Sequence, residues 1–271
     1  MLRFVREAEG EIISFSYPLF EAQEEKKPRL EPWQRRSAMT APTSRTDFIT
    51  LAEEHRQELL VGSGIDPAVI EERGYKTVWG SSDPALLRAG FKESQRRGSG
   101  WIAPLFSPLG GKEYIYKPTA DPRRNAHGKI IKYEYPSGHG MILDAHPRTL
   151  PLLGAPGVRL WIPEGIKKGD ALVSRGEAAL SLQGIYGWRG KNAVGGATAL
   201  ADWEQVALNG RDVLIVFDSD ATSNPNVASA RARLARFLKA RGAHVLIVHL
   251  PAGPGGAKQG ADDYLVAGGV L

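Results

Sequence analysis

The chain has 271 residues and a formal net charge of +5, and 42% of its residues are hydrophobic, enough for one large domain or two smaller ones. The positive charge favours phosphate-bearing partners over cationic ones. Because the sequence has no cysteine, disulfides, thiolate zinc sites and cysteine nucleophiles are excluded, and a cytoplasmic location is expected. No apolar run approaches the roughly 20 residues that cross a bilayer, so no membrane partner is predicted.

Residues 1–45 are predicted to form a disordered N-terminal lead. The part from Glu21 to Arg45 is rich in charge, proline, serine and threonine, and it has too little apolar periodicity to be buried. Met39 stands just before the ordered-looking part, so the sequence leaves both Met1 and Met39 open as the true start.

Residues 46–98 are predicted to be a short helical segment. Two of its helices are expected to begin at Asp66-Pro67 and Asp83-Pro84, since an N-cap aspartate followed by proline is a typical helix start. Residues 99–147 are predicted to form a smaller strand-rich, basic subdomain, with strands over 101–106, 114–116 and 129–135.

The strand-rich subdomain interleaves cations with tyrosines. This composition suits single-stranded nucleic acid, which binds through phosphate pairing and base stacking. The same alternation also arises from packing on a half-buried sheet, so both interpretations stay open. The cations are Lys112, Lys117, Arg123, Arg124, Lys129 and Lys132, and the tyrosines are Tyr114, Tyr116, Tyr133 and Tyr135.

Residues 148–271 alternate strand-like and helix-like segments, which predicts an α/β domain with a parallel sheet flanked by helices. Glu164 follows one strand, and Asp218 and Asp220 follow another. The ends of parallel strands meet at one sheet edge, so these carboxylates are expected to converge, and Mg²⁺ is the cation that suits them best. Taken alone, an aspartate at a strand end also fits helix capping.

Other chemistries lack their motifs. The six histidines show no His-Glu-x-x-His spacing, and no hydrolase elbow is present. No glycine-rich segment has the Walker A pattern, which excludes an intrinsic helicase motor.

A glutamate after the first strand of an α/β unit and Asp-x-Asp after the third resemble the Toprim domain. The resemblance implies that Glu164 acts as general acid or base. It also implies that Asp218 and Asp220, with Glu164, hold Mg²⁺ or Mn²⁺ during nucleotidyl transfer or strand cleavage. Upstream, the segment 128–137 is similar to the one that precedes the Toprim unit of bacterial and phage primases. Lys132 is then expected to contact template or nucleotide, although an edge-strand lysine is an equal alternative.

A Toprim-like domain of unknown function in proteins of phages, plasmids and other mobile elements is more similar still. The matching segments are 164–172, 184–190, 217–227 and 258–265. We expect nucleic acid or nucleotide to be bound by Arg124, Lys132, Lys167, Lys168, Arg189 and Lys258.

One position departs from the primase pattern. Bacterial-type primases carry an aspartate four residues after the glutamate, where this chain has Lys168. The change should weaken one metal position or let an ammonium hold phosphate directly. Asp262 or Asp263 can restore the missing ligand, and capping of the last helix is the alternative role for this pair.

Together these observations predict a magnesium-dependent, primase-like Toprim nucleotidyltransferase in mobile-element DNA replication. Its expected partners are single-stranded DNA, nucleoside triphosphates and a replicative helicase or polymerase. Two alternatives stay open, a Toprim-type metal-dependent nuclease and a non-catalytic nucleic-acid-binding replication module.

Overall fold

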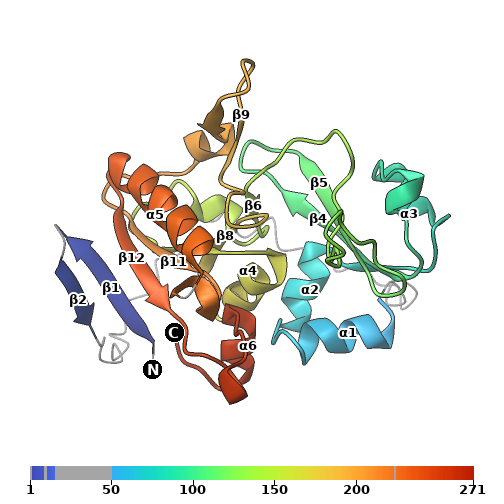
Figure 1. The fold of residues 1–271 in the computed structure, drawn as a ribbon, viewed down its shortest axis with the longest axis horizontal. Coiled ribbons are helices and arrows are strands. Elements are labelled where there is room, and N and C mark those ends of the chain that lie inside the picture. The colour runs from blue at the N-terminus through green and yellow to red at the C-terminus, as the bar shows by residue number, and fades with distance from the viewer. Residues whose placement is uncertain (1, 9–10, 16–50, 223) are drawn as a thin grey trace, which may run out of the picture.

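The main sheet has seven strands in the order β2-β1-β12-β11-β7-β8-β6 (Figure 1). The computed structural model describes residues 2–8, 11–15, 51–222 and 224–271. The four central strands are parallel, and the outer ones pair antiparallel to their neighbours. This confirms the predicted mixed α/β class with a parallel-rich sheet. The bounds are β6 (Asp144–Ala145), β7 (Leu160–Pro163), β8 (Ala178–Ser181), β11 (Asp212–Val216) and β12 (His244–His249).

Two strands lie within the segment that we expected to be a disordered lead, so this expectation is wrong for residues 3–8 and 11–15. They are β1 (Arg3–Ala8) and β2 (Glu11–Phe15). Strand β1 pairs antiparallel with β12, with Phe4 opposite Val248. The physical reason is that β12 would otherwise present unpaired backbone groups at the sheet edge. The expected disorder of residues 16–45 and the start-site question at Met39 lie outside the described residues.

The central strands are apolar on both faces because helices cover both faces. In β11, Leu214 and Val216 join one hydrophobic core, and Val213 and Ile215 join the other. The first core includes residues of α4 (Ile166–Val173) and α6 (Ala261–Val266), and the second includes residues of α5 (Pro225–Ala240). These helices and strands confirm the alternating pattern that we expected in this half of the chain.

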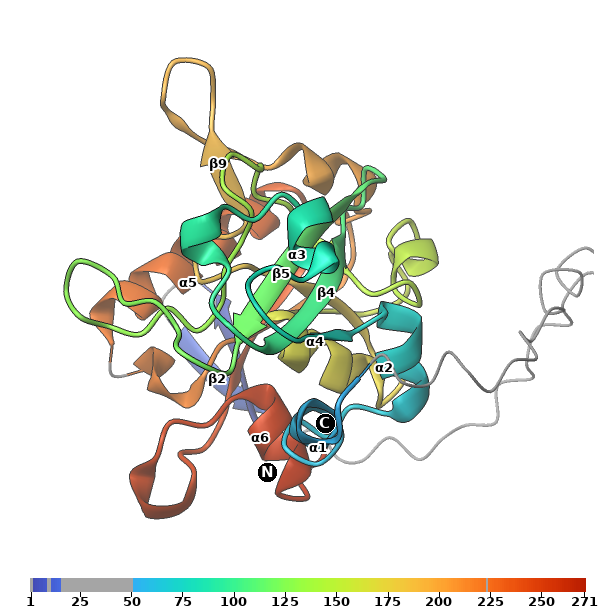
Figure 2. The same cartoon turned by 90° about the vertical axis from the view of Figure 1, so that its right-hand side faces the viewer.

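The part of the chain between α1 and β6 contains a three-stranded antiparallel sheet in the order β3-β4-β5 (Figure 2). Asp66 and Asp83 cap α2 and α3 as predicted, since their side chains accept hydrogen bonds of 2.8 Å from the backbone of Ala68 and Ala85. The bounds are α1 (Glu53–Leu60), α2 (Pro67–Arg73), β3 (Lys76–Val78), α3 (Pro84–Arg88), β4 (Gly100–Phe106) and β5 (Lys112–Pro118).

The expected strand over 129–135 does not form. Only isolated bridges occur there, between Tyr116 and Glu134 and between Arg124 and Ile130. Glu134 is buried, and Arg123 binds it through two hydrogen bonds of 2.6 Å, so a side-chain contact organises this segment more than a strand ladder does.

A buried ion-pair network joins the two sheets. Arg73 at the end of α2 lies between Asp144 of β6 and Asp170 of α4, with nitrogen–oxygen distances of 2.6 and 2.5 Å. The Tyr75 hydroxyl donates a further hydrogen bond of 2.8 Å to Asp170. Because β6 pairs with β8, the end of the predicted strand-rich subdomain is part of the main sheet.

The shorter elements complete the chain. A hairpin of β9 (Arg189–Lys191) and β10 (Ala197–Ala199) projects from the main body (Figure 1). Among the described residues, no helix combines the length and apolar character that a bilayer span requires. The 3₁₀ helices span Glu93–Gln95, Leu150–Leu152, Ala201–Gln205, Ser219–Thr222 and Pro254–Gly256.

Candidate functional site

The strands β7 and β11 are parallel neighbours, with Pro163 opposite Val216. Glu164 follows β7 directly, and Asp218 comes two residues after β11. Asp220 lies in the 3₁₀ helix that begins at the next residue. The register therefore brings the three predicted catalytic carboxylates to the same sheet edge, as the sequence led us to expect.

Two lysines contact these carboxylates. Lys168 on α4 places its Nζ 2.6 Å from Oδ1 of Asp218. Lys258 places its Nζ 3.1 Å from Oδ2 of Asp218 and 3.0 Å from Oδ2 of Asp220. Each oxygen of the buried Asp218 carboxylate thus has an ammonium neighbour, and Lys258 bridges the two aspartates.

Glu164 lies within the electrostatic influence of the same groups. Burial raises the pKa of Glu164, and Asp218 and Asp220 raise it further, whereas Lys168 and Lys258 lower it. The net pKa shift is upward, so Glu164 retains a proton to higher pH than a solvated glutamate. This behaviour suits a group that exchanges protons with a substrate.

The adjacent aspartates of α6 have different roles. Asp262 is buried, and its Oδ2 accepts a hydrogen bond of 3.1 Å from Ser63 Oγ. Its Oδ1 is also buried and accepts no hydrogen bond from any residue that the structure describes. Asp263 is exposed, and its carboxylate accepts a hydrogen bond of 2.9 Å from the backbone N–H of Gly260. Asp263 therefore caps α6, and its expected metal role has no support from its placement.

Gly260 sets the spacing of the site. A Cβ atom at this position would come into hard contact with Cε of Lys168 and would lie 2.7 Å from Oδ1 of Asp262 and 3.3 Å from Oδ1 of Asp218. The absence of a side chain thus lets three groups from separate elements meet. We call the six residues that gather here the carboxylate–lysine cluster: Glu164, Lys168, Asp218, Asp220, Lys258 and Asp262.

Four predicted nucleic-acid-binding residues have other surroundings. Lys167 donates a hydrogen bond of 3.0 Å to Glu58, Arg124 donates one of 2.8 Å to the Gly128 carbonyl, and the Arg189 guanidinium lies 4.7 Å from the centre of the Tyr186 ring. Lys132 is exposed and makes no hydrogen bond or ion pair with a described residue. These cations are outside the contacts that define the cluster.

Three residues near the cluster were not predicted to belong to it, although Tyr133 and Tyr135 were candidates for base stacking. Ser63 comes from the segment after α1, and no motif marks it. Burial raises the pKa of Tyr133 and of Tyr135, and the charges of Asp262 and Glu164 respectively add to these upward shifts. The two tyrosines belong to the primase-like segment, so that resemblance was the available signal.

The carboxylates of the cluster are candidate metal ligands. Among residues 2–8, 11–15, 51–222 and 224–271, no group of three or more His, Cys, Asp or Glu side chains is arranged to hold a metal ion. A Mg²⁺ ion held by Asp218 and Asp220 with water and substrate phosphates does fit, because the Lys258 ammonium already occupies the cation position that these carboxylates share.

A known family model covers the region of this site, and solved structures are similar in fold. The family model described as a domain of unknown function (DUF3854) matches residues 152–271, the region that contains the whole cluster. No curated protein matches the sequence. The DnaG catalytic core is similar in structure, with a TM-score of 0.53 and 18% identity over 80% of this chain and 69% of that chain.

The primase of Aquifex aeolicus, in a structure of its zinc-binding and RNA polymerase domains, gives a TM-score of 0.51 and 15% identity. The match covers 79% of this chain and 52% of that chain, so this chain spans about half the length of the Aquifex structure. Structural similarity at such low sequence identity shows a shared fold. The chain has the mixed α/β fold of primase catalytic cores.

Proposed function

We propose that this chain is a primase-like nucleotidyltransferase that synthesises primers on single-stranded DNA from nucleoside triphosphates. The observation that carries the proposal is the meeting of Glu164, Asp218 and Asp220 with two lysines at the ends of adjacent parallel strands. The primase-core fold supports the same reaction class. A role in mobile-element replication, with a helicase or polymerase partner, belongs to the same proposal.

Asp218 and Asp220 are the residues that would hold Mg²⁺. When bound, this ion neutralises triphosphate charge and polarises the attacked phosphorus. Lys258 has to move away from the aspartates for this to happen. The Lys258 side chain is 53% exposed, so its displacement breaks few contacts. The residue also follows a segment with glycines at 253, 255 and 256, where the backbone can change conformation at low cost.

The protein's own side chains have the remaining roles. Glu164, with its raised pKa, accepts the proton of the attacking hydroxyl. Lys168 and the displaced Lys258 bind phosphate oxygens, which Lys does as a compact point charge. Lys132 is exposed beside Tyr133 and is proposed to contact the template strand.

Primer synthesis tests the proposal. The protein is incubated with a single-stranded template, ribonucleotides and Mg²⁺, and products are resolved by length. The wild type should yield template-dependent products, and Asp218→Ala with Asp220→Ala should abolish them. Products that persist at the wild-type rate in this double variant would refute the assignment. Shortening of the template without nucleotides would favour a nuclease instead.

A second function is favoured by the ion pairs themselves. Lys168 and Lys258 neutralise Asp218 without a metal, which suits a non-catalytic nucleic-acid-binding module of a replication complex. Binding of single-stranded DNA that is unchanged in EDTA, together with no turnover in Mg²⁺ or Mn²⁺, would select this function over catalysis.

A further inference from the structure

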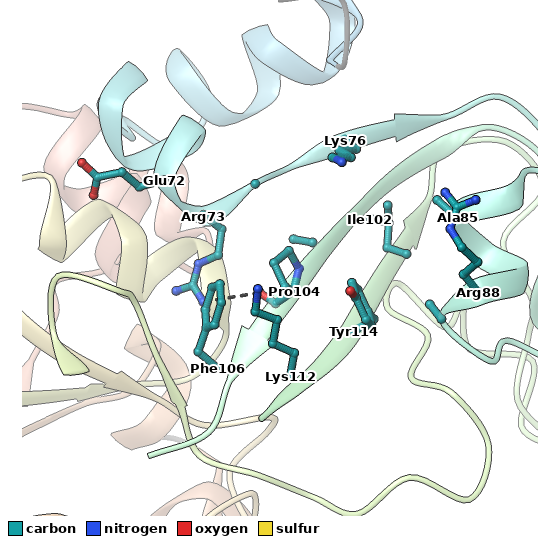
Figure 3. Close-up of a pocket in the computed structure, with 13 residues that line it drawn as sticks. Glu72, Arg73, Lys76, Ala85, Arg88, Ile102, Pro104, Phe106, Lys112 and Tyr114 are labelled. Atoms are coloured by element: carbon teal, nitrogen blue, oxygen red, sulfur yellow. Dashed lines mark hydrogen bonds between the residues drawn. The ribbon is translucent and has the colours of Figure 1, made fainter. Parts of the chain in front are cut away.

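A pocket of about 440 Å³ opens on the sheet of β3, β4 and β5, between α2 and α3 (Figure 3). Trp101, Ala103 and Leu105 of β4 join the core shared with the main sheet. Because side chains alternate along a strand, Ile102, Pro104 and Phe106 face the opposite way and line the pocket. The pocket is therefore on the face of this sheet that points away from that shared core.

Three exposed cations from three elements line the pocket. Lys76 belongs to β3, Arg88 to α3 and Lys112 to β5. Figure 3 shows them around Ile102 and Tyr114. None of the three forms a hydrogen bond or ion pair with a carboxylate in the described part of the chain. The Lys112 ammonium lies 5.2 Å from the centre of the Phe106 ring.

The other charged groups of the pocket are already compensated. Arg73 also lines it, but its charge is balanced by Asp144 and Asp170. Glu72 is the acidic residue among the lining side chains, and Arg148 binds its carboxylate with hydrogen bonds of 2.7 and 2.8 Å. The pocket thus has three positive charges without a neutralising partner in its lining.

We propose that this pocket is a second nucleotide site, which binds a nucleoside triphosphate apart from the carboxylate–lysine cluster. Lys76, Arg88 and Lys112 would bind the phosphates, and the half-buried Tyr114 ring would contact the base. A mononucleotide is favoured over a nucleic-acid strand for two reasons. The three cations surround a single pocket and do not form a line along the surface. The pocket volume is within the roughly 300–1,000 Å³ of small-molecule sites.

Binding of ATP in EDTA tests the proposal, because without divalent metal the measurement does not depend on the aspartates. The affinity is measured by calorimetry for the full chain. Lys76→Ala with Arg88→Ala and Lys112→Ala should weaken ATP binding by about tenfold or more. A matched control, Lys191→Ala with Arg233→Ala and Arg236→Ala, removes the same charge from exposed positions elsewhere and should bind ATP as the wild type does.

Two further measurements make the result specific. Tyr114→Leu should reduce the preference for ATP over inorganic triphosphate. Lys168→Ala with Lys258→Ala removes the proposed phosphate-binding lysines of the cluster and should retain ATP binding in EDTA, so a failure of the proposed primase activity and a failure of this site are distinguishable. Equal ATP affinity in the pocket triple variant and its control would overturn the proposal. So would a pocket that binds oligothymidylate but not ATP, since that result would identify a strand-binding surface.

Discussion

The ammonium group of Lys258 lies 3.0 Å from Oδ2 of Asp220, although the two residues are separated by 38 positions and follow different strands. The same nitrogen lies 3.1 Å from Oδ2 of Asp218. A lysine at this point balances charge that would otherwise repel, so the site is electrostatically stable without a metal. The same contact makes Lys258 a competitor of any divalent cation.

Removal of Lys258 should strengthen metal binding. In Lys258→Ala the aspartates lose their shared cation, and the affinity for Mn²⁺ should rise about three- to tenfold. Titration of Mn²⁺ followed by electron paramagnetic resonance measures this directly. Lys191→Ala removes the same charge from an exposed position at the end of β9 and should leave the affinity unchanged. An unaltered or weaker Mn²⁺ affinity in Lys258→Ala would show that the lysine does not compete.

A methyl group at position 260 should disturb the cluster. In Gly260→Ala the new Cβ meets Lys168, Asp262 and Asp218, so these groups have to move apart. Primer synthesis should fall by about a hundredfold, the scale expected for a misplacement of about 1 Å, while stability falls by ~1–3 kcal/mol. Primer synthesis and urea unfolding measure the two effects.

The control for this change is Gly154→Ala. A Cβ at residue 154 would have no atom within 4 Å, so activity and stability should stay near those of the wild type. If the two alanine variants behave alike, crowding at Gly260 is not the cause.

The buried Arg73 should be among the residues most sensitive to substitution. Arg73→Met leaves Asp144 and Asp170 buried without their cation, and the free energy of unfolding should decrease by about 3–5 kcal/mol. Urea denaturation measures the change. Arg148→Met breaks a comparable two-bond pair with Glu72 at the surface and should cost at most about 1 kcal/mol. Similar losses in both variants would contradict the importance of burial.

Stability should fall in mild acid because of His146. Burial lowers the pKa of His146 from 6.5 to about 4, and the charge of Arg73 lowers it further, whereas the hydrogen bond to the Val69 carbonyl raises it. The unfolded chain binds a proton below about pH 6.5 and the folded chain only near pH 4. Stability is therefore complete above pH 6.5, and up to about 3 kcal/mol is lost as the pH falls to 4.

Urea unfolding at several pH values measures this slope. His146→Gln removes the titrating group, so its stability should decline less between pH 6.5 and 4 than that of the wild type. Burial also lowers the pKa of His55, which should leave some slope in the variant. An identical pH dependence in wild type and variant would exclude His146 as the source.

The sequence by itself determined the local and periodic features. Aspartate followed by proline specified the starts of α2 and α3, because the cap and the fixed proline φ act within one turn. Apolar runs specified the buried parallel strands, and strand order along the chain placed Glu164 and Asp218 at one edge. These predictions depend on neighbours in sequence and on the general geometry of parallel sheets.

Only the tertiary structure decided which groups touch. No local pattern distinguishes Asp262, which turns to the cluster, from Asp263, which caps its own helix, since they are adjacent residues of one type. The pairing of β1 with β12 and the contacts of Ser63 and Lys258 join segments far apart in the chain. The physical reason is that such contacts depend on the positions and orientations of packed helices and strands in three dimensions. Sequence periodicity indicates only which face of each element is buried.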